Sequence, residues 1–179
     1  EADSLRNEKL KVLHALRPIA PDDVATFTVR GQYARGRTAD GTTLPSYLED
    51  LGEDATSDTE TYVAIRAEVH SWRWGTVPFY LRSGKRLAEK CSEIVIQFKA
   101  APWSIFPGKP RANRLLIRIQ PDEGVTLSVS TKDPTPTDSL ALRQADINIA
   151  FEKAFGTRYP DAYERLLLDV VRGDPILFI

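Results

Sequence analysis

The chain has 179 residues, of which 42% are hydrophobic and 27% are charged, and its formal net charge is -1. These values are typical of one soluble globular domain and give no indication of a nucleic acid or an anionic membrane as a partner. No apolar run approaches the roughly 20 residues that a membrane-spanning helix needs, and the first residues lack the apolar stretch of a signal peptide. The single cysteine, Cys91, has no partner for an internal disulfide, so we expect a reducing, cytoplasmic location.

The two ends of the chain indicate a fragment of a longer protein. The chain opens on Glu1, contains no methionine, and stops in the apolar residues 176–179. An apolar terminus normally packs against a further part of the chain or against another subunit. We therefore expect a fragment rather than a complete protein.

The first third of the chain predicts a helix, a strand and a loop. The helix has Ser4 as its N-cap, and Pro18 ends it. Residues 24–33 alternate well enough for a strand. Residues 38–60 contain seven acidic side chains and no Lys or Arg, which indicates a solvated connection.

The rest of the chain reads as strands at short spacing. β-branched and aromatic residues separated by turns predict strands at residues 61–72, 77–83, 93–100, 113–120 and 125–132. Residues 121–124 form a tight reversal that joins the last two strands into a hairpin. Residues 140–150 fit a helix or a strand, and we favour the strand.

The strongest helix follows at the end of the chain. Asp161 is its expected cap, Glu164 bonds back to the cap, and Gly173 ends it. Its apolar residues repeat at helical spacing, so we expect them to be buried: Tyr163, Leu166, Leu167, Val170 and Val171. Strands without intervening helices predict antiparallel pairing. The sequence therefore predicts an α+β fold with a large, mainly antiparallel sheet and a few helices on one face.

Catalytic, nucleotide-binding and metal-binding motifs are missing. None of the ten glycines forms the G-x-G-x-x-G turn of a dinucleotide site, and no P-loop occurs. His14 and His70 have no carboxylate at a spacing that suggests a general base. Together with Cys91 they are too few and too distant for a metal site. We expect no catalytic, cofactor-binding or metal-binding residue in this chain.

A basic stretch is the one feature that suggests a ligand. Its nine cations are opposed only by Glu89 and Glu93: Arg82, Lys85, Arg86, Lys90, Lys99, Lys109, Arg111, Arg114 and Arg118. In the string Arg-Ser-Gly-Lys-Arg, Gly84 frees the backbone to curl between cations. Such a loop suits a phosphorylated or polyhydroxylated ligand, but spacing alone leaves a merely solvated charge run equally open.

Aromatic residues flank this stretch and raise the alternative of nucleic acid stacking: Trp72, Trp74, Phe79, Tyr80, Trp103 and Phe106. Most of them fall on strand positions that we expect to face a core. The strand signature of an RRM is missing, and the net charge is slightly negative. We expect no nucleic acid partner.

Five strings carry a family resemblance, in family order and over nearly the whole chain: RNEK (6–9), VRGQY (29–33), WRWGTVPFYLRSGKRL (72–87), RIQPDEG (118–124) and PDAYERLLLD (160–169). They resemble the glucose-6-phosphate dehydrogenase family. The resemblance implies that residues 1–179 are its C-terminal domain, which serves substrate binding and oligomerisation, without the N-terminal coenzyme domain. It also implies the parent reaction, hydride transfer from C1 of glucose 6-phosphate to NADP, which gives 6-phosphogluconolactone in the pentose phosphate pathway.

The resemblance transfers only a minority of the sugar site. It implies substrate binding by Lys85, Lys90 and Gln120, and it gives Arg86 no ligand role. The family's histidine base lies in a His-Tyr-Leu-Gly-Lys stretch that is absent here, and the missing domain binds NADP. We therefore expect the isolated chain to be inactive, and we expect a homodimer or homotetramer through the sheet.

Some family members hold a second, structural NADP on this sheet. The positions of its ligands here read Cys91, Val95, Thr126 and Ser128, and only Arg82 and Arg118 remain. Two arginines alone cannot cradle a 2′-phosphate, so the resemblance argues against this site. The alternative to a dehydrogenase fragment is a free-standing antiparallel-sheet module for oligomerisation or anion binding.

Overall fold

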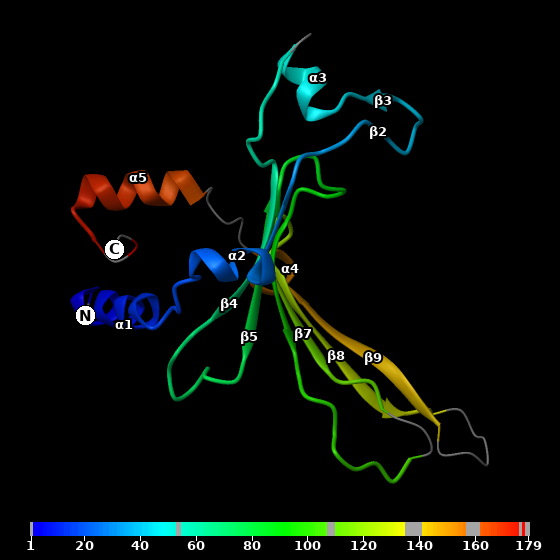
Figure 1. Ribbon diagram of the computed structural model, residues 1–179. Helices are drawn as coiled ribbons and strands as arrows, with labels where there is room; N and C mark the ends of the chain where they lie inside the picture. The colour runs from blue at the N-terminus through cyan, green and yellow to red at the C-terminus, as the bar shows by residue number, and fades with distance from the viewer. Residues whose placement is uncertain are drawn as a thin grey trace. The chain divides into compact units, whose positions relative to one another are not determined.

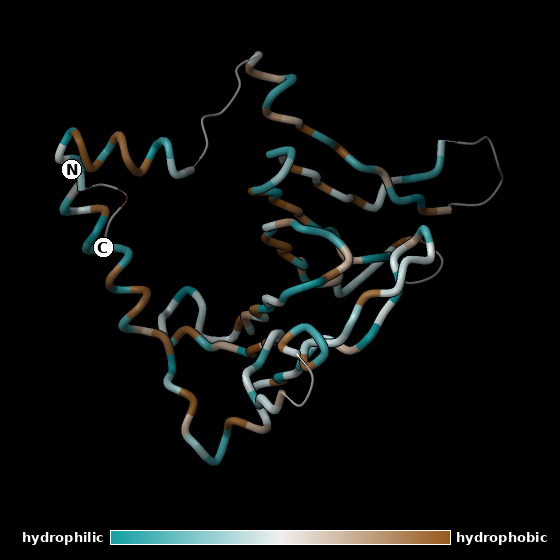
Figure 2. The backbone as a smooth tube through the Cα atoms, turned by 90° about the horizontal axis from the view of Figure 1, so that it is seen from above, coloured by the Kyte–Doolittle hydropathy of each residue, from teal (hydrophilic) through white to brown (hydrophobic). Residues whose placement is uncertain are grey.

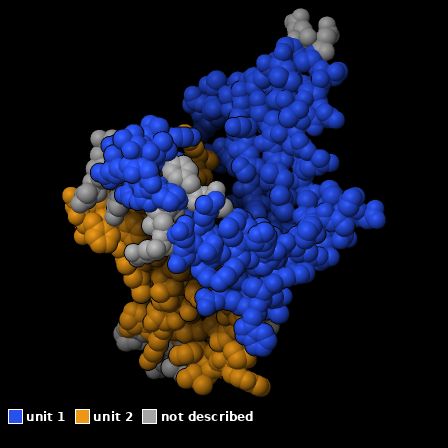
Figure 3. Space-filling view, turned by 90° about the vertical axis from the view of Figure 1, so that its left-hand side faces the viewer, with its two compact units in different colours: residues 1–88, 162–179 blue, residues 89–161 orange. Residues whose placement is uncertain are grey.

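The computed structural model describes residues 2–52, 55–106, 110–134, 141–156, 162–175 and 177 (Figure 1). They fall into two compact units, residues 1–88 with 162–179 and residues 89–161 (Figure 3). Each unit contains its own antiparallel sheet. None of the described helices is long and apolar enough to cross a membrane.

The helical elements are α1 (Ala2–His14), the 3-10 helix η1 (Pro21–Asp23), α2 (Val24–Phe27), α3 (Tyr47–Leu51), α4 (Phe151–Phe155) and α5 (Ala162–Arg172). The strands are β1 (Thr28–Gly31), β2 (Gly36–Arg37), β3 (Thr43–Leu44), β4 (Tyr62–Glu68), β5 (Pro78–Gly84), β6 (Ser92–Gln97), β7 (Arg114–Gln120), β8 (Gly124–Lys132) and β9 (Leu142–Ala150).

The first unit is built around β4, the central strand of a sheet in the order β1–β4–β5. Both neighbours are antiparallel to β4, and the small hairpin β2–β3 is separate. The segment after α1 joins the end of β4, where Leu16 and Val69 form a bridge and the Arg17 N–H donates to the Glu68 carbonyl at 2.9 Å. Val69 is only 4% exposed and marks the buried part of this unit.

The second unit is a meander of four strands in the order β6–β7–β8–β9, all antiparallel. The predicted hairpin is confirmed, because β7 and β8 pair on either side of the reversal, where Asp122 has a φ of 56°. The ambiguous segment before Phe151 is a strand, as favoured, for its residues 142–150. Apolar and polar residues interleave along the backbone in both units (Figure 2).

The α+β class and the antiparallel pairing are confirmed, with the strands shared among sheets of three, two and four strands. Two expectations near the N-terminus are wrong. α1 begins at Ala2, so Ser4 lies inside the helix and does not cap it. Residues 24–27 form α2, and β1 starts only at Thr28. Pro21 opens a helical turn there, and the Thr28 hydroxyl donates to the Val24 carbonyl at 2.7 Å and closes it.

The acidic segment is more than a solvated connection. It contains α3, because Ser46 and Glu49 form a reciprocal capping box that satisfies two backbone N–H groups at the helix start. Acids of the segment pair with arginines from outside it: Glu49 with Arg35, Asp50 with Arg86, and Glu60 with Arg30. The helix α4 is a further element that the sequence analysis missed.

The predicted apolar stripe of α5 is mostly exposed rather than buried, and of its residues only Leu166 is half-buried. Tyr163, Leu167 and Val171 are 66–84% exposed. The buried residue on this helix is Asp169, at 1% exposure, and its carboxylate accepts from the Arg165 Nε at 3.2 Å. Helical spacing identifies the apolar face of a helix, but it does not say what covers that face. Several residues that the sequence singled out lie outside the described residues: Glu1, Glu53, Asp54, Lys109, Pro160, Asp161, Ile176, Phe178 and Ile179.

Candidate functional site

Lys85 follows β5 directly and is the best-placed of the predicted ligands. Its backbone N–H donates to the Thr61 carbonyl at 2.8 Å, which continues the pairing of β5 with β4 by one step. Its side chain is exposed. Among the described residues, no ion pair or hydrogen bond of its ammonium group occurs. A lysine held by its backbone with a free ammonium is suited to bind an anionic ligand.

Gly84 has a different role from the one expected. It ends β5 opposite Tyr62 and does not start a curl. A Cβ at this position would lie 2.8 Å from Tyr62 Cδ2 and 3.2 Å from the Thr61 carbonyl oxygen. The glycine is required because the Tyr62 ring occupies the space of a side chain. The chain leaves the extended conformation afterwards, at Arg86, whose φ is 52°.

Arg86 is anchored by three contacts, and one of its partners is held in turn. Its guanidinium forms an ion pair with Asp50 at 2.6 Å and donates to the Pro45 carbonyl at 3.2 Å. The same group lies 4.8 Å from the centre of the Tyr33 ring. The Tyr33 hydroxyl donates to the same Asp50 oxygen, Oδ2, at 2.7 Å, and this hydrogen bond raises the pKa of Tyr33. Sequence reasoning missed this cluster, since a lone Arg in a charge run shows no partner.

Lys90 and Gln120 belong to the second unit. Gln120 ends β7 and pairs with Ser92, two residues after Lys90, across a β-bulge at the start of β6. Both side chains are exposed at this end of the β6–β7 pair. The structure therefore brings Lys90 and Gln120 to one strand end, while Lys85 lies in the other unit. The grouping of all three stays a prediction.

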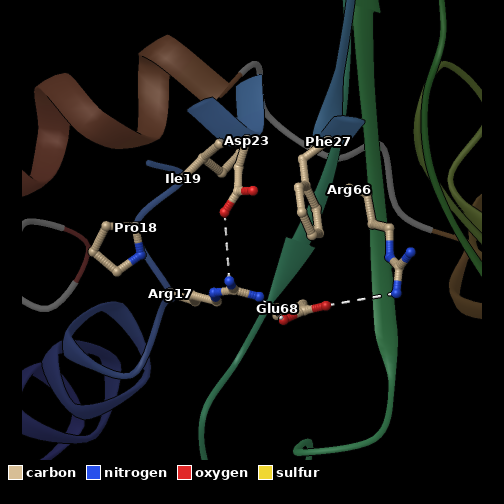
Figure 4. A pocket seen from close by; sticks show the side chains of 7 residues that line it. All are labelled: Arg17, Pro18, Ile19, Asp23, Phe27, Arg66 and Glu68. Atoms are coloured by element: carbon tan, nitrogen blue, oxygen red, sulfur yellow. Dashed lines mark hydrogen bonds and ion pairs between the residues drawn. The ribbon is translucent and has the colours of Figure 1, made fainter. Parts of the chain in front are cut away.

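The first unit has a shallow depression whose charged lining residues pair with one another (Figure 4). Arg17 donates to Glu68 at 3.0 Å and lies 3.6 Å from Asp23, while Arg66 lies 3.5 Å from Glu68. Both guanidinium groups lie 5.5 Å from the centre of the Phe27 ring. The hydrogen bond from Arg17 lowers the pKa of Glu68. Each charge in the depression has a counter-charge, so it stabilises the fold and does not offer a free ligand site.

One histidine, His70, lies near a carboxylate, that of Glu68, which the sequence analysis did not predict. His70 Nε2 lies 3.9 Å from Glu68 Oε2, which is beyond hydrogen-bond distance. That carboxylate already accepts from Arg17, so the pair is not arranged as a general base and its orienting group. His14 lies exposed on α1. No group of three or more His, Cys, Asp or Glu side chains suited to a metal occurs in the described parts of the chain.

Comparison with known proteins decides the family. A family profile described as "Glucose-6-phosphate dehydrogenase, C-terminal domain" matches residues 1–179. The chain belongs to this family. It is 52% identical to the glucose-6-phosphate 1-dehydrogenases of Rhizobium meliloti and of Gluconobacter oxydans, covering 100% of this chain and 36% of each relative. The chain thus spans about a third of the length of these curated relatives.

Solved structures give the same result. A structure described as "Glucose-6-phosphate dehydrogenase in complex with its substrate glucose-6-phosphate" is 36% identical, with a TM-score of 0.80. It matches 100% of this chain over 35% of its own length. The glucose-6-phosphate 1-dehydrogenase from Mycobacterium avium is 33% identical with a TM-score of 0.75, and 99% of this chain covers 34% of it.

The residues of the sheet do not fit the structural coenzyme that some dehydrogenases of this family hold. The Thr126 hydroxyl, at one ligand position, donates to the Asn148 side chain at 2.7 Å. Val95 is an exposed alkyl side chain, and Arg118 is paired with Glu93 at 3.6 Å. Hydroxyl and alkyl groups with an already compensated arginine cannot neutralise a phosphate. The other remaining arginine, Arg82, lies on β5 of the first unit.

The aromatic residues around the basic stretch are placed differently from the expectation. Trp72, Tyr80 and Trp103 are 74–105% exposed, and Trp74 is 38% exposed. The expectation that most of these rings face a core is wrong for the chain by itself. Trp72, Trp74 and Trp103 lie between strands, and only Tyr80 of these four rings lies on one. The three tryptophans therefore do not occupy the strand positions on which the expectation rested.

Proposed function

We propose that this chain is part of an NADP-dependent oxidoreductase that oxidises glucose 6-phosphate to 6-phosphogluconolactone, in the cytoplasmic pentose phosphate pathway. It would supply part of the sugar-phosphate site and the subunit interface. The observation that carries the proposal is the match of the whole chain to relatives that are 52% identical and carry this enzyme's name. The geometry supports it too, because Lys85 directly follows β5, is exposed, and has no counter-charge among the described residues.

The coenzyme and the general base belong, in this proposal, to the part of the longer enzyme outside this chain. The sequence contains neither a glycine-rich dinucleotide turn nor the histidine stretch of the family. The contribution of this chain is to hold oxygen atoms of the sugar phosphate. Lysine ammonium groups give charge-assisted hydrogen bonds to the anion, and the Gln120 amide bonds a hydroxyl or orients a lysine.

The test removes each lysine from the full-length enzyme. Lys85→Ala or Lys90→Ala removes a charge-assisted hydrogen bond of roughly 1.5–3 kcal/mol, which corresponds to an increase in KM for glucose 6-phosphate of about 10- to 150-fold. KM for NADP should change little, because the lysines do not contact the coenzyme. Steady-state kinetics with each substrate varied in turn measures both constants.

Lys99→Ala is the matched control for this experiment. Lys99 is an exposed lysine just beyond β6, in the same basic stretch, and the resemblance gives it no ligand role. Arg86→Ala is unsuitable as a control, because Arg86 is held by Asp50 and Pro45. Kinetics of the Lys85 and Lys90 variants that match those of Lys99→Ala would rule out a ligand role for these residues.

For the subunit interface, the proposal rests on exposed apolar side chains of the second unit. Ile94 and Ile96 on β6 and Ile147 and Ile149 on β9 are 41–55% exposed. Exposed apolar side chains on both edge strands of one sheet are typical of a surface that another chain or domain covers. We infer a homodimer or homotetramer of the full-length enzyme that associates through this sheet.

A further inference from the structure

The turn after β5 is anchored on both sides of Lys85. Before Lys85, the Tyr62 ring lies against Gly84, and the Lys85 N–H is bound by Thr61. After it, Arg86 is held by residues of the segment that contains α3. We propose that Arg86 is a positioning residue for Lys85. Because Asp50 and Tyr33 hold the Arg86 side chain, they fix the turn and with it the direction in which the Lys85 side chain leaves the sheet. This inference rests on the sugar-phosphate role of Lys85 proposed above.

The anchoring contacts of Arg86 use the full shape of its side chain. The planar guanidinium points one nitrogen at the Asp50 carboxylate, at 2.6 Å, and another at the Pro45 carbonyl, at 3.2 Å. The central carbon of the group lies over the Tyr33 ring, 4.8 Å from the ring centre. A lysine could form the ion pair, but it has neither the fork for both acceptors nor the plane for the ring. The geometry therefore points to arginine.

The partner of Arg86 is itself held in place. The Tyr33 hydroxyl donates to Asp50, and Asp50 lies on α3, whose start is capped by Ser46 and Glu49. The Tyr33 ring also meets the Tyr47 ring edge to face, with 5.7 Å between ring centres. Asp50 and Arg86 are 28% and 35% exposed, so the pair is shielded from water more than a free surface pair would be. Because the Asp50 carboxylate is held in place, it can fix the position of the Arg86 guanidinium.

The backbone at Arg86 shows why an anchor is needed. Its φ of 52° lies in the left-handed region, which residues other than glycine rarely occupy. Such a conformation persists where surrounding contacts determine it. Without the side-chain contacts of Arg86, the turn would relax toward commoner backbone angles. The backbone at Lys85 would then no longer hold the Lys85 side chain in one direction. A flexible lysine would then pay more entropy on binding the ligand.

A purely structural role makes a different prediction from a positioning role. If Arg86 only stabilises the segment around α3, its loss lowers thermal stability and affects both substrates alike. If it acts through Lys85, its loss raises KM for glucose 6-phosphate only while Lys85 is present. The two roles separate in a double-mutant cycle.

The experiment uses the full-length enzyme with Arg86→Met, Lys85→Ala and the double variant. Methionine keeps the apolar stem and removes the charged fork. We expect Arg86→Met to raise KM for glucose 6-phosphate by about tenfold in the presence of Lys85 and by less than about twofold in the Lys85→Ala background. KM for NADP should be unchanged, and Arg86→Lys should fall between wild type and Arg86→Met.

Two further variants keep the test decisive. Asp50→Asn replaces Arg86→Met in the test if Arg86→Met folds poorly. It removes the charge of the anchor while its amide oxygen can still accept from the Tyr33 hydroxyl, so it should raise KM for glucose 6-phosphate as Arg86→Met does. Arg35→Met breaks the ion pair of Arg35 with Glu49 on the same helix without touching Arg86, and the Ser46–Glu49 capping box remains, so it should raise KM for glucose 6-phosphate by much less than Arg86→Met does. An equal increase from Arg35→Met would assign the effect to the stability of α3 and overturn the inference.

The outcomes also separate this inference from the proposed function. An equal increase in KM from Arg86→Met in both backgrounds would show that Arg86 does not act through Lys85, while leaving the role of Lys85 intact. A Lys85→Ala variant with the wild-type KM would remove the ligand role of Lys85, and the positioning role of Arg86 with it. Only a large effect that disappears in the Lys85→Ala background supports the inference.

Discussion

Tyr62 shows at the scale of single residues how a side chain determines its neighbours. It lies on β4 between Gly31 on β1 and Gly84 on β5, and its ring covers Gly84 only. We expect Gly84→Ala to destabilise the protein by about 1–3 kcal/mol, because the new Cβ would overlap the Tyr62 ring and the Thr61 carbonyl. The midpoint of thermal unfolding of the full-length enzyme measures this loss.

Gly31→Ala is the matched control for this prediction. Gly31 faces the same tyrosine from the other strand, but a Cβ there meets no atom within 4 Å. Its φ lies outside the left-handed region, so alanine should be neutral or stabilising by up to about 0.5 kcal/mol. Equal losses from both substitutions would show that crowding by Tyr62 does not select the glycine.

At the scale of elements, α3 depends on one ionised side chain. The hydrogen bond from Arg35, together with those from Ser46, lowers the pKa of Glu49 from 4.5 to about 2. A lowered carboxyl pKa contributes stability above the unfolded value of 4.5, and this contribution is lost as the pH falls toward 2. We expect α3 to loosen over that window, and Glu49→Gln to loosen it at every pH above the window too.

Pepsin, which is active under acid conditions, measures this loosening. The readout is the rate of cleavage within residues 47–51 relative to cleavage elsewhere in the same chain, which cancels the pH dependence of the protease. In the wild type the ratio should rise as the pH falls from 4.5 to 2, and in Glu49→Gln it should be high throughout. A wild-type ratio independent of pH over that range would contradict the role given to Glu49.

For the whole molecule, the isolated chain should not reduce NADP with glucose 6-phosphate. The sequence contains no dinucleotide turn, and in the part of the chain that the structure describes neither histidine has a carboxylate within hydrogen-bond distance, since Glu68 lies 3.9 Å from His70. The purified chain is compared with a blank that contains no enzyme, by absorbance of the reduced coenzyme. Turnover above the blank would show that this chain carries a base and a coenzyme site of its own.

The association of the full-length enzyme is a second prediction at this scale. We expect light scattering at micromolar concentration to give the mass of a dimer or tetramer. Replacing Ile147 and Ile149 on β9 by lysine should reduce that mass, because each puts a charge on an exposed apolar strand. A wild-type monomer would mean that another part of the longer protein covers this sheet.

The sequence by itself determined the local elements and the family. β-branched and aromatic runs between turns located β4 to β8, and the reversal at residues 121–124 identified the hairpin. These patterns depend on neighbours within a few residues, so they can be read along the chain. The family strings, whose order and length are specific, also predict ligand roles for Lys85, Lys90 and Gln120, and these roles stay predictions.

Only the tertiary structure decided what surrounds those residues. Arg86 pairs with Asp50, and Glu49 with Arg35, across separations that no local pattern encodes. The role of Gly84 depends on a ring from the neighbouring strand. The acidic segment contains α3, which a capping box stabilises together with these distant arginines. Contacts between segments far apart in the chain depend on how the elements pack. A charge run in the sequence therefore cannot show which of its cations is anchored and which is free to bind a ligand.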